Sequence, residues 1–418
     1  MIEALYRGLT RAAAPGIALL LHARAGKGKE DAARLGERWG HASRPRPAGK
    51  LIWVHAASVG EATSVLPLIA RLVTRASVLV TTGTVTSAAL MAERLPANAF
   101  HQFAPVDVPR AVGRFFNFWR PDLGVWVESE LWPNLVLGAA ARGIPLALVQ
   151  GRMSAESLKG WQRAPGFARR LVSAFRVLLA QTEADAERFR ALGASATRVV
   201  GNLKFVAPPL PAEDAERARL AEALRGRKVW CAASTHDPEE RIVWRVHRRL
   251  AAEHPGLLTI VVPRHPARGA AIAEALVADG ARLARRGAGE TPDAATDVYL
   301  VDTLGELGLV YRLSPIVFVG GSLIDHGGQN PLEPARLDRA VLHGPSMFNF
   351  ADAVAALRAA GASEEVADEA ALAVAVGRML ADPADAARRG RAAGGVARAG
   401  QDALDAVEAA LLPMIPAP

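Results

Sequence analysis

The chain of 418 residues has little of several things, beginning with cysteine, of which Cys231 is the single example. One thiol excludes a disulfide framework and a cysteine-rich metal site, and it is typical of a protein from a reducing compartment. Long hydrophobic runs are also missing. The longest early run, Ala12–Leu21, is interrupted by Pro15 and Gly16, whereas a membrane-spanning helix needs about 20 apolar residues.

Familiar nucleotide and metal signatures are absent as well. The sequence contains no G-x-x-x-x-G-K-[ST] and no G-x-G-x-x-G motif, so neither P-loop chemistry nor NAD binding is indicated. It contains no H-E-x-x-H motif and no spaced Cys/His set, so we expect no metal. With 50% hydrophobic and 22% charged residues, the chain has ample material for a packed core, which excludes general disorder.

Positive charge is concentrated at the N-terminus. Residues 1–50 hold ten Lys/Arg and four Asp/Glu, a net charge of +6 out of +8 for the whole chain. A nucleic-acid-binding protein more often carries basic residues throughout its folded domains, so we expect no nucleic-acid partner. A basic segment beside a short apolar run instead predicts that residues 1–25 form an interfacial helix on an anionic membrane surface. The alternative is an ordinary amphipathic helix packed on the first domain.

Strand-like and helical segments alternate from residue 51 onward, which predicts parallel sheets with crossover helices. Three prolines in Val206–Pro211 predict a linker at 206–211. We therefore expect an α/β protein of the GT-B type, in which two Rossmann-like domains face a cleft. An N-terminal membrane-associated helix precedes them in the chain. The expected parts are a membrane segment at 1–40, domains at 41–205 and 212–418, and a last helix that could return to the first domain.

Ligands of open α/β sheets bind beyond the carboxyl ends of the strands, where the first half places three acids. Glu61 follows the predicted strand Leu51–Ala57, and Glu128 and Glu130 follow Leu123–Val127. Each acid has two interpretations. It could stabilise a helix N-terminus through the macrodipole, or it could be a functional group such as a general base.

In the second half, Ser234, Thr235 and His236 follow a predicted strand and are free to line a site. Asp237–Glu240 predicts a capping box with Asp237 as N-cap, Pro238 at N1 and Glu240 at N3. Arg264 ends another strand and suits an anionic ligand, while His265 is either a ligand or a satisfied loop histidine.

The segment Gly320–Ala335 has four glycines and then opens a helix, with Asn330 predicted as N-cap, Pro331 at N1 and Glu333 at N3. Glycines let a ligand approach the backbone closely. Exposed N–H groups and the helix dipole therefore predict an anion site there.

Seven motifs, in order, resemble the 3-deoxy-D-manno-oct-2-ulosonic acid (Kdo) transferase family. ERWG (Glu37–Gly40) also resembles the juxtamembrane motif of that family, and the resemblance extends from about residue 1 to 410. The seven motifs are WVHAASVGE (Trp53–Glu61), ESELWPNL (Glu128–Leu135), GNLKF (Gly201–Phe205), ASTHDPEE (Ala233–Glu240), VPRHP (Val262–Pro266), GGSLIDHGGQNPLEPA (Gly320–Ala335) and GPSMFNF (Gly344–Phe350).

The resemblance implies an inverting GT-B glycosyltransferase that moves Kdo from CMP-Kdo to the tetra-acylated lipid A precursor without a metal or other cofactor. It implies the cytoplasmic face of the inner membrane, reached peripherally or through a single N-terminal anchor. Glu61 matches the catalytic base, and Glu128 and Lys204 match residues that stabilise the transition state. The positions matching CMP-binding segments are Arg264, His265, Gly305, Glu306, Leu307, Asn330, Pro331, Leu332 and Glu333.

Four positions depart from the family pattern. Ser129 stands where Thr is common and Gln329 where His is common, while TTGTVTS (Thr81–Ser87) replaces TTMTPTG and QGRMS (Gln150–Ser154) replaces NARLS. Two rival classes stay open. One is a nucleotide-sugar 2-epimerase, which would use UDP. The other is a non-catalytic membrane or nucleic-acid-binding protein, in which the acids at the strand ends would repel the phosphates of its partner.

Overall fold

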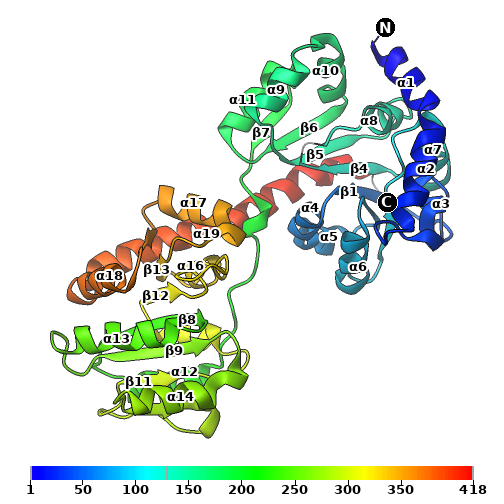
Figure 1. Cartoon of the computed structure of the whole chain (residues 1–418). Helices are drawn as coiled ribbons and strands as arrows, with labels where there is room; N and C mark the ends of the chain where they lie inside the picture. Colours follow the sequence, from blue (N-terminus) through cyan, green and yellow to red (C-terminus); the bar gives the residue numbers. More distant parts are fainter. Residues whose placement is uncertain (1, 129, 417–418) are drawn as a thin grey trace. The chain divides into compact units, whose positions relative to one another are not determined.

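The computed structural model describes residues 2–128 and 130–416, so the departure at Ser129 lies outside the described residues. The chain divides into two compact units (Figure 1). Unit 1 comprises Met1–Val206 and Ala399–Pro418, and unit 2 comprises Ala207–Arg398. The segment 1–40, expected to stand apart, is counted within unit 1. Residues 399–418, assigned to the second domain from the sequence, also belong to unit 1, as the returning-helix alternative allowed.

Unit 1 is built on seven parallel strands: β1 (Leu51–His55), β2 (Ser77–Thr82), β3 (Ala99–Phe103), β4 (Leu123–Val127), β5 (Leu146–Gly151), β6 (Phe175–Ala180) and β7 (Thr197–Val199). Their order in the sheet is β3-β2-β1-β4-β5-β6-β7. Every residue of β1 and β4 is buried, as expected for strands covered on both faces. The order runs outward from the β1–β4 pair in both directions, so this pair is the topological switch point.

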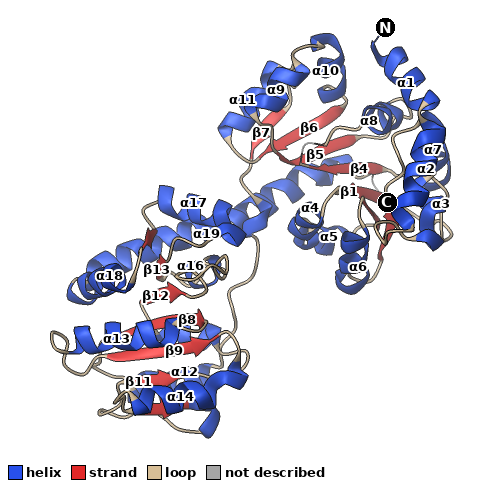
Figure 2. Cartoon of the chain, viewed as in Figure 1, coloured by secondary structure: helices blue, strands red, loops and turns tan. Residues whose placement is uncertain are grey.

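Helices cover both faces of this sheet (Figure 2). Two short helices follow β1, and Pro67 stands in the first turn of the second, where its missing N–H costs no hydrogen bond. The helices of unit 1 are α1 (Ile2–Ala12), α2 (Ala14–Ala25), α3 (Leu35–Arg38), α4 (Val59–Ser64), α5 (Leu66–Leu72), α6 (Val85–Arg94), α7 (Pro109–Trp119), α8 (Pro133–Ala140), α9 (Ala155–Trp161), α10 (Pro165–Val172), α11 (Glu183–Ala191), the C-terminal part of α19 (Pro383–Leu411), and the 3₁₀ turns η1 (Ala32–Arg34), η2 (Leu203–Phe205) and η6 (Leu412–Met414).

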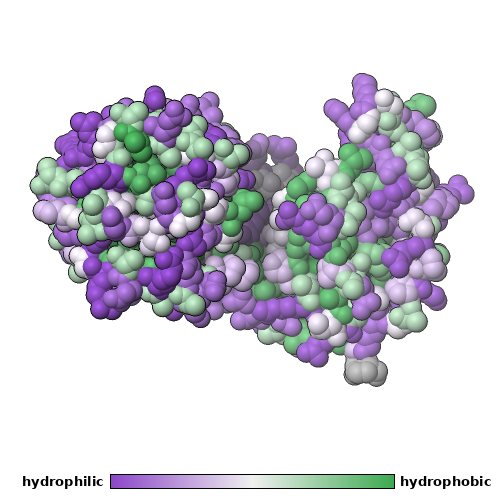
Figure 3. All heavy atoms as spheres, turned by 90° about the horizontal axis from the view of Figure 1, so that it is seen from below, coloured by the Kyte–Doolittle hydropathy of each residue, from purple (hydrophilic) through white to green (hydrophobic). Residues whose placement is uncertain are grey.

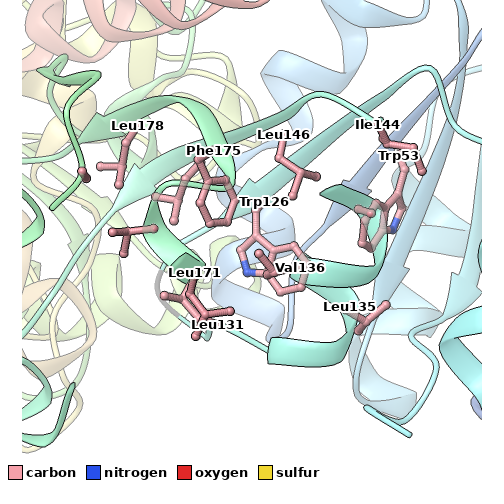
Figure 4. Packing of buried hydrophobic residues seen from close by; sticks show 14 of the residues in the cluster. Trp53, Trp126, Leu131, Leu135, Val136, Ile144, Leu146, Leu171, Phe175 and Leu178 are labelled. Atoms are coloured by element: carbon pink, nitrogen blue, oxygen red, sulfur yellow. The ribbon is translucent and has the colours of Figure 1, made fainter. Parts of the chain in front are cut away.

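Two tryptophans form the centre of the core on one face of this sheet (Figure 4). Trp53 of β1 meets Trp126 of β4 edge-on, with ring centroids 5.6 Å apart. Gly124 makes this packing possible, because a Cβ there would lie 2.5 Å from Leu146 Cδ2 and 3.2 Å from the Trp53 ring. Aromatic edge-to-face pairs of this kind add to the stabilisation from buried area.

Unit 2 repeats the plan with seven parallel strands: β8 (Val229–Thr235), β9 (Leu258–Pro263), β10 (Leu283–Arg285), β11 (Val298–Leu300), β12 (Ile316–Val319), β13 (Ala340–His343) and β14 (Ser363–Glu365). Their order is β10-β11-β9-β8-β12-β13-β14, which places the switch point at the β8–β12 pair. The expectation of two Rossmann-like units is therefore confirmed. The helices are α12 (Asp214–Ala223), α13 (Glu239–Ala251), α14 (Gly269–Ala278), α15 (Leu307–Leu313), α16 (Leu332–Ala335), α17 (Ala351–Ala359), α18 (Glu369–Ala381), the first part of α19, and the 3₁₀ turns η3 (Pro266–Arg268), η4 (Arg286–Ala288) and η5 (Phe348–Phe350).

The N-terminal segment forms two successive helices, α1 and α2, rather than the single helix expected over 1–25. Pro15, which lacks an N–H, stands in the first turn of α2. One face of α1 is held on unit 1, since Tyr6 Oη donates to Asp107 Oδ2 at 2.9 Å and Asn134 Nδ2 donates to Thr10 Oγ1 at 3.0 Å. Among the described residues, no helix combines the length and the apolar character needed to cross a bilayer.

Large apolar side chains remain exposed on these two helices. Elsewhere, hydrophilic and hydrophobic residues are mixed over the faces of both units that Figure 3 displays. The exposed side chains, between 47% and 75% accessible, are Ile2, Leu5, Leu9, Leu19 and Leu20.

The ERWG motif fixes the segment after α2 to unit 1. Glu37 is buried, accepts the backbone N–H of Phe103 at 2.7 Å, and pairs with Arg34 at 2.8 Å. Gly40 has φ +79° and lies so close to α7 that a Cβ would be 2.1 Å from Ala111 O. The first and last residues of the motif, Glu37 and Gly40, thus each have a structural role in this packing.

Candidate active site

The three acids predicted in unit 1 come together at the switch point. Glu61 lies in the first turn of α4 after β1, and Glu128 and Glu130 follow β4. β1 and β4 are paired in parallel, so their carboxyl ends meet at one edge of the sheet. The negative charges of Glu128 and Glu130 both raise the pKa of Glu61, so all three carboxylates act on one region.

Glu61 is buried with few hydrogen-bond donors. Its Oε2 accepts the N–H of Ala57 at 2.7 Å and its Oε1 accepts the Ser58 hydroxyl at 3.0 Å, while Ser58 Oγ accepts the Glu61 N–H at 3.3 Å. Burial raises the pKa of Glu61 to about 7 despite these two donors. Glu61 thus lies at the start of a helix, and its carboxyl group can exchange a proton near neutral pH.

Glu128 is paired with Lys204. Their Oε1 and Nζ atoms are 2.9 Å apart, and both side chains are partly buried. The Glu128 backbone has φ +61°, a left-handed conformation that is costly for a residue with a Cβ and is concentrated at functional sites.

Gln150, one of the departures from the family pattern, positions the turn that carries Lys204. Its Oε1 accepts the N–H of Leu203 at 2.8 Å and its Nε2 donates to Asn202 Oδ1 at 2.9 Å. The same Asn202 oxygen accepts the N–H of Lys204 at 2.9 Å. The end of β5 thus fixes η2, and with it the cation beside Glu128.

A cavity of about 540 Å³ lies at this edge of the sheet within unit 1. Its walls come from α1 and α2, from the loops after β1, β2 and β3, and from Glu130 and Trp132 after β4. Ala57 and Ser58, the two hydrogen-bond partners of Glu61, are part of the wall. A substrate hydroxyl in this cavity would thus be close to the Glu61 carboxylate.

Two polar residues of the cavity wall were not identified from the sequence. Asp107 accepts the N–H groups of Asn134 and Leu135 and the Tyr6 hydroxyl, and burial raises its pKa. It lies beyond β3, a strand that the sequence did not reveal, so no strand-end argument could reach it.

His55 is the second, and the signal was available, because it ends β1 inside WVHAASVGE. Its Nδ1 lies 3.0 Å from Thr81 Oγ1, which also accepts the Trp53 indole N–H at 2.8 Å. Burial, reinforced by the charge of Arg38, lowers the pKa of His55 to about 3, so the ring is neutral.

In unit 2, the strand ends bring together three histidines. His236 follows β8, and its ring centroid lies 5.7 Å from that of His265 after β9 and 4.1 Å from that of His326 after β12. Gln329, which stands where the family commonly has His, contacts the cluster directly, because its Nε2 is 3.2 Å from His236 Nε2. Burial and the two neighbouring rings lower the pKa of His236. Within the described residues, no group of three or more His, Cys, Asp or Glu side chains is arranged to hold a metal ion.

Arg264 lies beside this cluster with an exposed side chain, and its backbone N–H is held by Thr235 O at 2.9 Å. Burial raises the pKa of Glu333, while Arg336, Asn330 and Arg264 lower it. Arg264 is thus near enough to sense Glu333, as expected for two segments of one site.

The glycine-rich segment differs from its prediction in two ways. α16 has only four residues and begins at Leu332, with Pro331 at the N-cap position. Asn330 still caps the turn through Oδ1, which accepts the Leu332 N–H at 3.1 Å, but so short a helix has little macrodipole. Asn330 Nδ2 donates a hydrogen bond to Glu333 Oε1 at 3.4 Å. The helix dipole on which the predicted anion site depended is therefore small.

Exposed loop N–H groups were the other part of that prediction, and three of them are already used. The N–H groups of Gly321, Ser322 and Leu323 donate to the carboxylate of Glu239 at 2.7, 3.1 and 3.1 Å. The capping box expected over 237–240 is wrong, because α13 begins at Glu239 and Glu240 bonds Thr235 and Arg268 instead.

The Gly305-Glu306-Leu307 turn follows β11 at the same edge. Glu306 stands at the N-cap position of α15 without a side-chain capping bond, forms an ion pair with Arg286 and accepts the Thr303 hydroxyl. Burial acts to raise the pKa of Glu306, but Arg286 and Thr303 outweigh it and the pKa is lowered. Gly305 has φ +83° and open space beside it, and Leu304 is 83% exposed. The tip of this turn is thus accessible to a ligand.

Two Rossmann-like units, one with a proton-exchanging carboxyl group and the other with basic groups at its strand ends, define an α/β protein with polar groups suited to binding and acid–base chemistry. Residues 33–207 match the family described as 3-Deoxy-D-manno-octulosonic-acid transferase (kdotransferase).

Three curated relatives are similar over most of their length. A probable mitochondrial 3-deoxy-D-manno-octulosonic acid transferase of Arabidopsis thaliana is 36% identical over 394 residues, covering 91% of this chain and 88% of the relative. The 3-deoxy-D-manno-octulosonic acid transferase of Haemophilus influenzae is 38% identical over 330 residues (76% of each chain), and that of Bordetella pertussis is 36% identical over 383 residues (87% and 89%).

Among solved structures, the C-terminal CMP-Kdo binding domain of WaaA from Acinetobacter baumannii is 34% identical, covers 44% of this chain and 96% of its own, and gives a TM-score of 0.42. A UDP-GlcNAc 2-epimerase from Neisseria meningitidis is 14% identical over 87% of this chain and 100% of its own, with a TM-score of 0.49. The identity of 36–38% to these three relatives, over at least 76% of each chain, shows the family. The chain belongs to the 3-deoxy-D-manno-octulosonic acid transferase family and is a Kdo glycosyltransferase of lipopolysaccharide biosynthesis.

Proposed function

We propose that this enzyme transfers Kdo from CMP-Kdo to the lipid A precursor (lipid IVA), with inversion at the anomeric carbon. Glu61 takes the proton from the acceptor hydroxyl as that oxygen attacks the face opposite the departing CMP. The new bond joins the acceptor oxygen to the anomeric carbon, the bond from that carbon to the phosphate oxygen breaks, and CMP leaves with the electron pair.

The observation that carries this proposal is the state of Glu61. A general base works best when its pKa is near the working pH, and burial raises the pKa of Glu61 to about 7. Its position beside the 540 Å³ cavity of unit 1 favours an acceptor hydroxyl as its partner.

Glu128 and Lys204 would act on the charge that develops as CMP departs. Departure leaves positive character on the anomeric carbon, which the Glu128 carboxylate stabilises, while Lys204 at 2.9 Å holds that carboxylate in position. Preorganised charges of this kind need no rearrangement during the reaction.

We assign the CMP moiety to the strand ends of unit 2. Arg264 and His265 are exposed after β9 and would bind the phosphate, since the N–H groups of Gly321, Ser322 and Leu323 already donate to Glu239. The accessible Gly305 turn and the Asn330–Glu333 segment complete the site. The family resemblance implies that neither a metal nor another cofactor takes part.

We place the enzyme peripherally at the cytoplasmic face of the inner membrane, through α1 and α2. The exposed leucines of these helices and the net charge of +6 in residues 1–50 support this location. Binding to vesicles of anionic phospholipid should weaken as salt rises. Salt-insensitive binding would indicate a purely apolar contact, and no binding would contradict the location.

Incubation of the enzyme with CMP-Kdo and lipid IVA, followed by mass spectrometry, tests donor, acceptor and number of transfers together. Glu61→Gln should leave the lipid unmodified while calorimetry shows unchanged CMP binding. Arg264→Ala should do the reverse and weaken CMP binding. Turnover with UDP-activated sugars but not with CMP-Kdo would contradict the donor assignment.

A further inference from the structure

Glu239 is a buried acid to which the proposed reaction gives no part. It is fully inaccessible to solvent, at 0% exposure, in the first turn of α13. Burying a carboxylate is expensive unless hydrogen bonds replace the lost water. The cost at this position must therefore be balanced by specific partners.

Four backbone N–H groups supply that balance, two on each oxygen. Oε1 accepts from Ser322 and Leu323, each at 3.1 Å, and Oε2 accepts from Gly321 at 2.7 Å and His236 at 3.0 Å. A proton on either oxygen would face an N–H donor, so these four hydrogen bonds favour the ionised carboxylate and oppose the rise in the pKa of Glu239 that burial causes.

These donors come from the two loops at the switch point of unit 2. His236 follows β8, and Gly321–Leu323 follows β12, more than 80 residues later in the chain. Gly320 shows how closely the loops are packed, because a Cβ there would lie 2.6 Å from Ser234 O. The loop amides form a cradle of the kind that binds phosphate in other folds, and here the chain fills it with its own anion.

We propose that Glu239 is a positioning residue for the donor site, an internal anion that locks the loops after β8 and β12 in their binding conformation. This inference rests on the proposed role of unit 2 in CMP binding. The donor phosphate then meets side chains at this edge, since Gly321–Leu323 have no N–H to offer it. Glu239 itself touches neither substrate nor reacting atoms.

Glu240 is a matched control on the same helix turn. It is also buried, at 3% exposure, but its oxygens bond the side chains of Thr235 and Arg268 rather than loop amides. A glutamine at 240 keeps an oxygen for both partners. A glutamine at 239 has one oxygen and one NH₂ for four N–H donors, so two amides lose their acceptor in either orientation.

The test compares Glu239→Gln with Glu240→Gln in the full-length enzyme. Glu239→Gln should raise the Kd for CMP and the KM for CMP-Kdo by about tenfold, as loss of charge-assisted hydrogen bonds predicts, with kcat changed little. Glu240→Gln should change neither by more than about twofold. Glu239→Asp, which keeps the charge, should recover part of the affinity. Equal losses in both glutamine variants, or a wild-type Kd in a folded Glu239→Gln variant, would overturn the proposal.

Hydrogen exchange on the wild-type enzyme tests the same idea without a substitution. The amides of Gly321, Ser322 and Leu323 should already be protected without ligand, and saturating CMP should add no protection. Rapid exchange that CMP suppresses would show that phosphate, not Glu239, is their partner. If the wild-type enzyme binds no CMP, the proposed function is refuted. Protection of these amides without ligand would still test whether Glu239 is their hydrogen-bond acceptor.

Discussion

Glu61 and Glu239 occupy equivalent places in the two units and have opposite surroundings. Each follows a switch-point strand, β1 or β8, and lies buried in the first turn of the next helix. Glu61 has one N–H and one hydroxyl from residues within four positions, whereas Glu239 has four N–H groups from two loops. Burial raises the pKa of both carboxyl groups, to about 7 at Glu61, where two donors oppose the rise, while four backbone N–H groups oppose it at Glu239.

The largest effect should follow loss of the exchangeable carboxylate. Glu61→Gln should lower kcat/KM by about 10²- to 10⁴-fold, the usual contribution of a general base, while the Kd for CMP stays unchanged. Steady-state transfer rates and calorimetry give the two numbers. Glu130→Gln on the neighbouring strand end serves as control and should keep most of the rate. A Glu61→Gln rate within threefold of wild type would remove the contrast with Glu239.

The folding stability of the wild-type enzyme should decrease as pH rises from 4.5 through 7. The stability of Glu61→Gln should decrease less over the same range. The pKa of Glu61 is raised from 4.5 to about 7 in the folded state, so the folded protein holds this proton more tightly than the unfolded chain does. The resulting stabilisation is complete below pH 4.5 and is lost as pH rises through 7, by at most about 3 kcal/mol. Urea unfolding of both proteins at several pH values measures it, and parallel curves would contradict the raised pKa.

A smaller effect should come from Lys204→Met. Without the cation at 2.9 Å, the Glu128 charge acts on Glu61 at full strength, so the acidic limb of the pH–rate profile should move to higher pH and the rate should fall by about tenfold. Lys204→Arg keeps the charge and should behave nearly as wild type. An unmoved limb in the methionine variant would separate Glu128 from the control of Glu61.

The smallest effect should be a shift in the opposite direction. Glu130 raises the pKa of Glu61 through its charge, so Glu130→Gln should move the acidic limb to lower pH without abolishing transfer. The corresponding change at Glu240 in unit 2 should leave the limb in place. A shift in both variants would indicate a general charge effect instead of a local one.

The sequence sufficed for the groups that depend on local order along the chain. β4 occurs at its predicted residues, and Glu61 and Glu128 lie at the strand ends where the pattern puts them. The partners of Glu239 could not be predicted, because they sit in a loop more than 80 residues away and its local context favoured a capping box. β3 was not predicted because Gln102 puts a polar side chain at an interior position of the strand. In the structure Gln102 is buried, and its Oε1 accepts the Trp119 indole N–H at 3.0 Å.

The helix α19 has a consequence for the order in which the protein is made. It starts at Pro383 in unit 2 and ends in unit 1, where Leu404, Val407 and Leu411 are core residues and Arg71 pairs with Asp405 and Glu408. Unit 1 therefore lacks part of its interior until residues 399–411 have been synthesised, whereas the polypeptide for unit 2 is finished earlier. A nonsense codon before position 399 would thus remove core residues from the unit that is translated first.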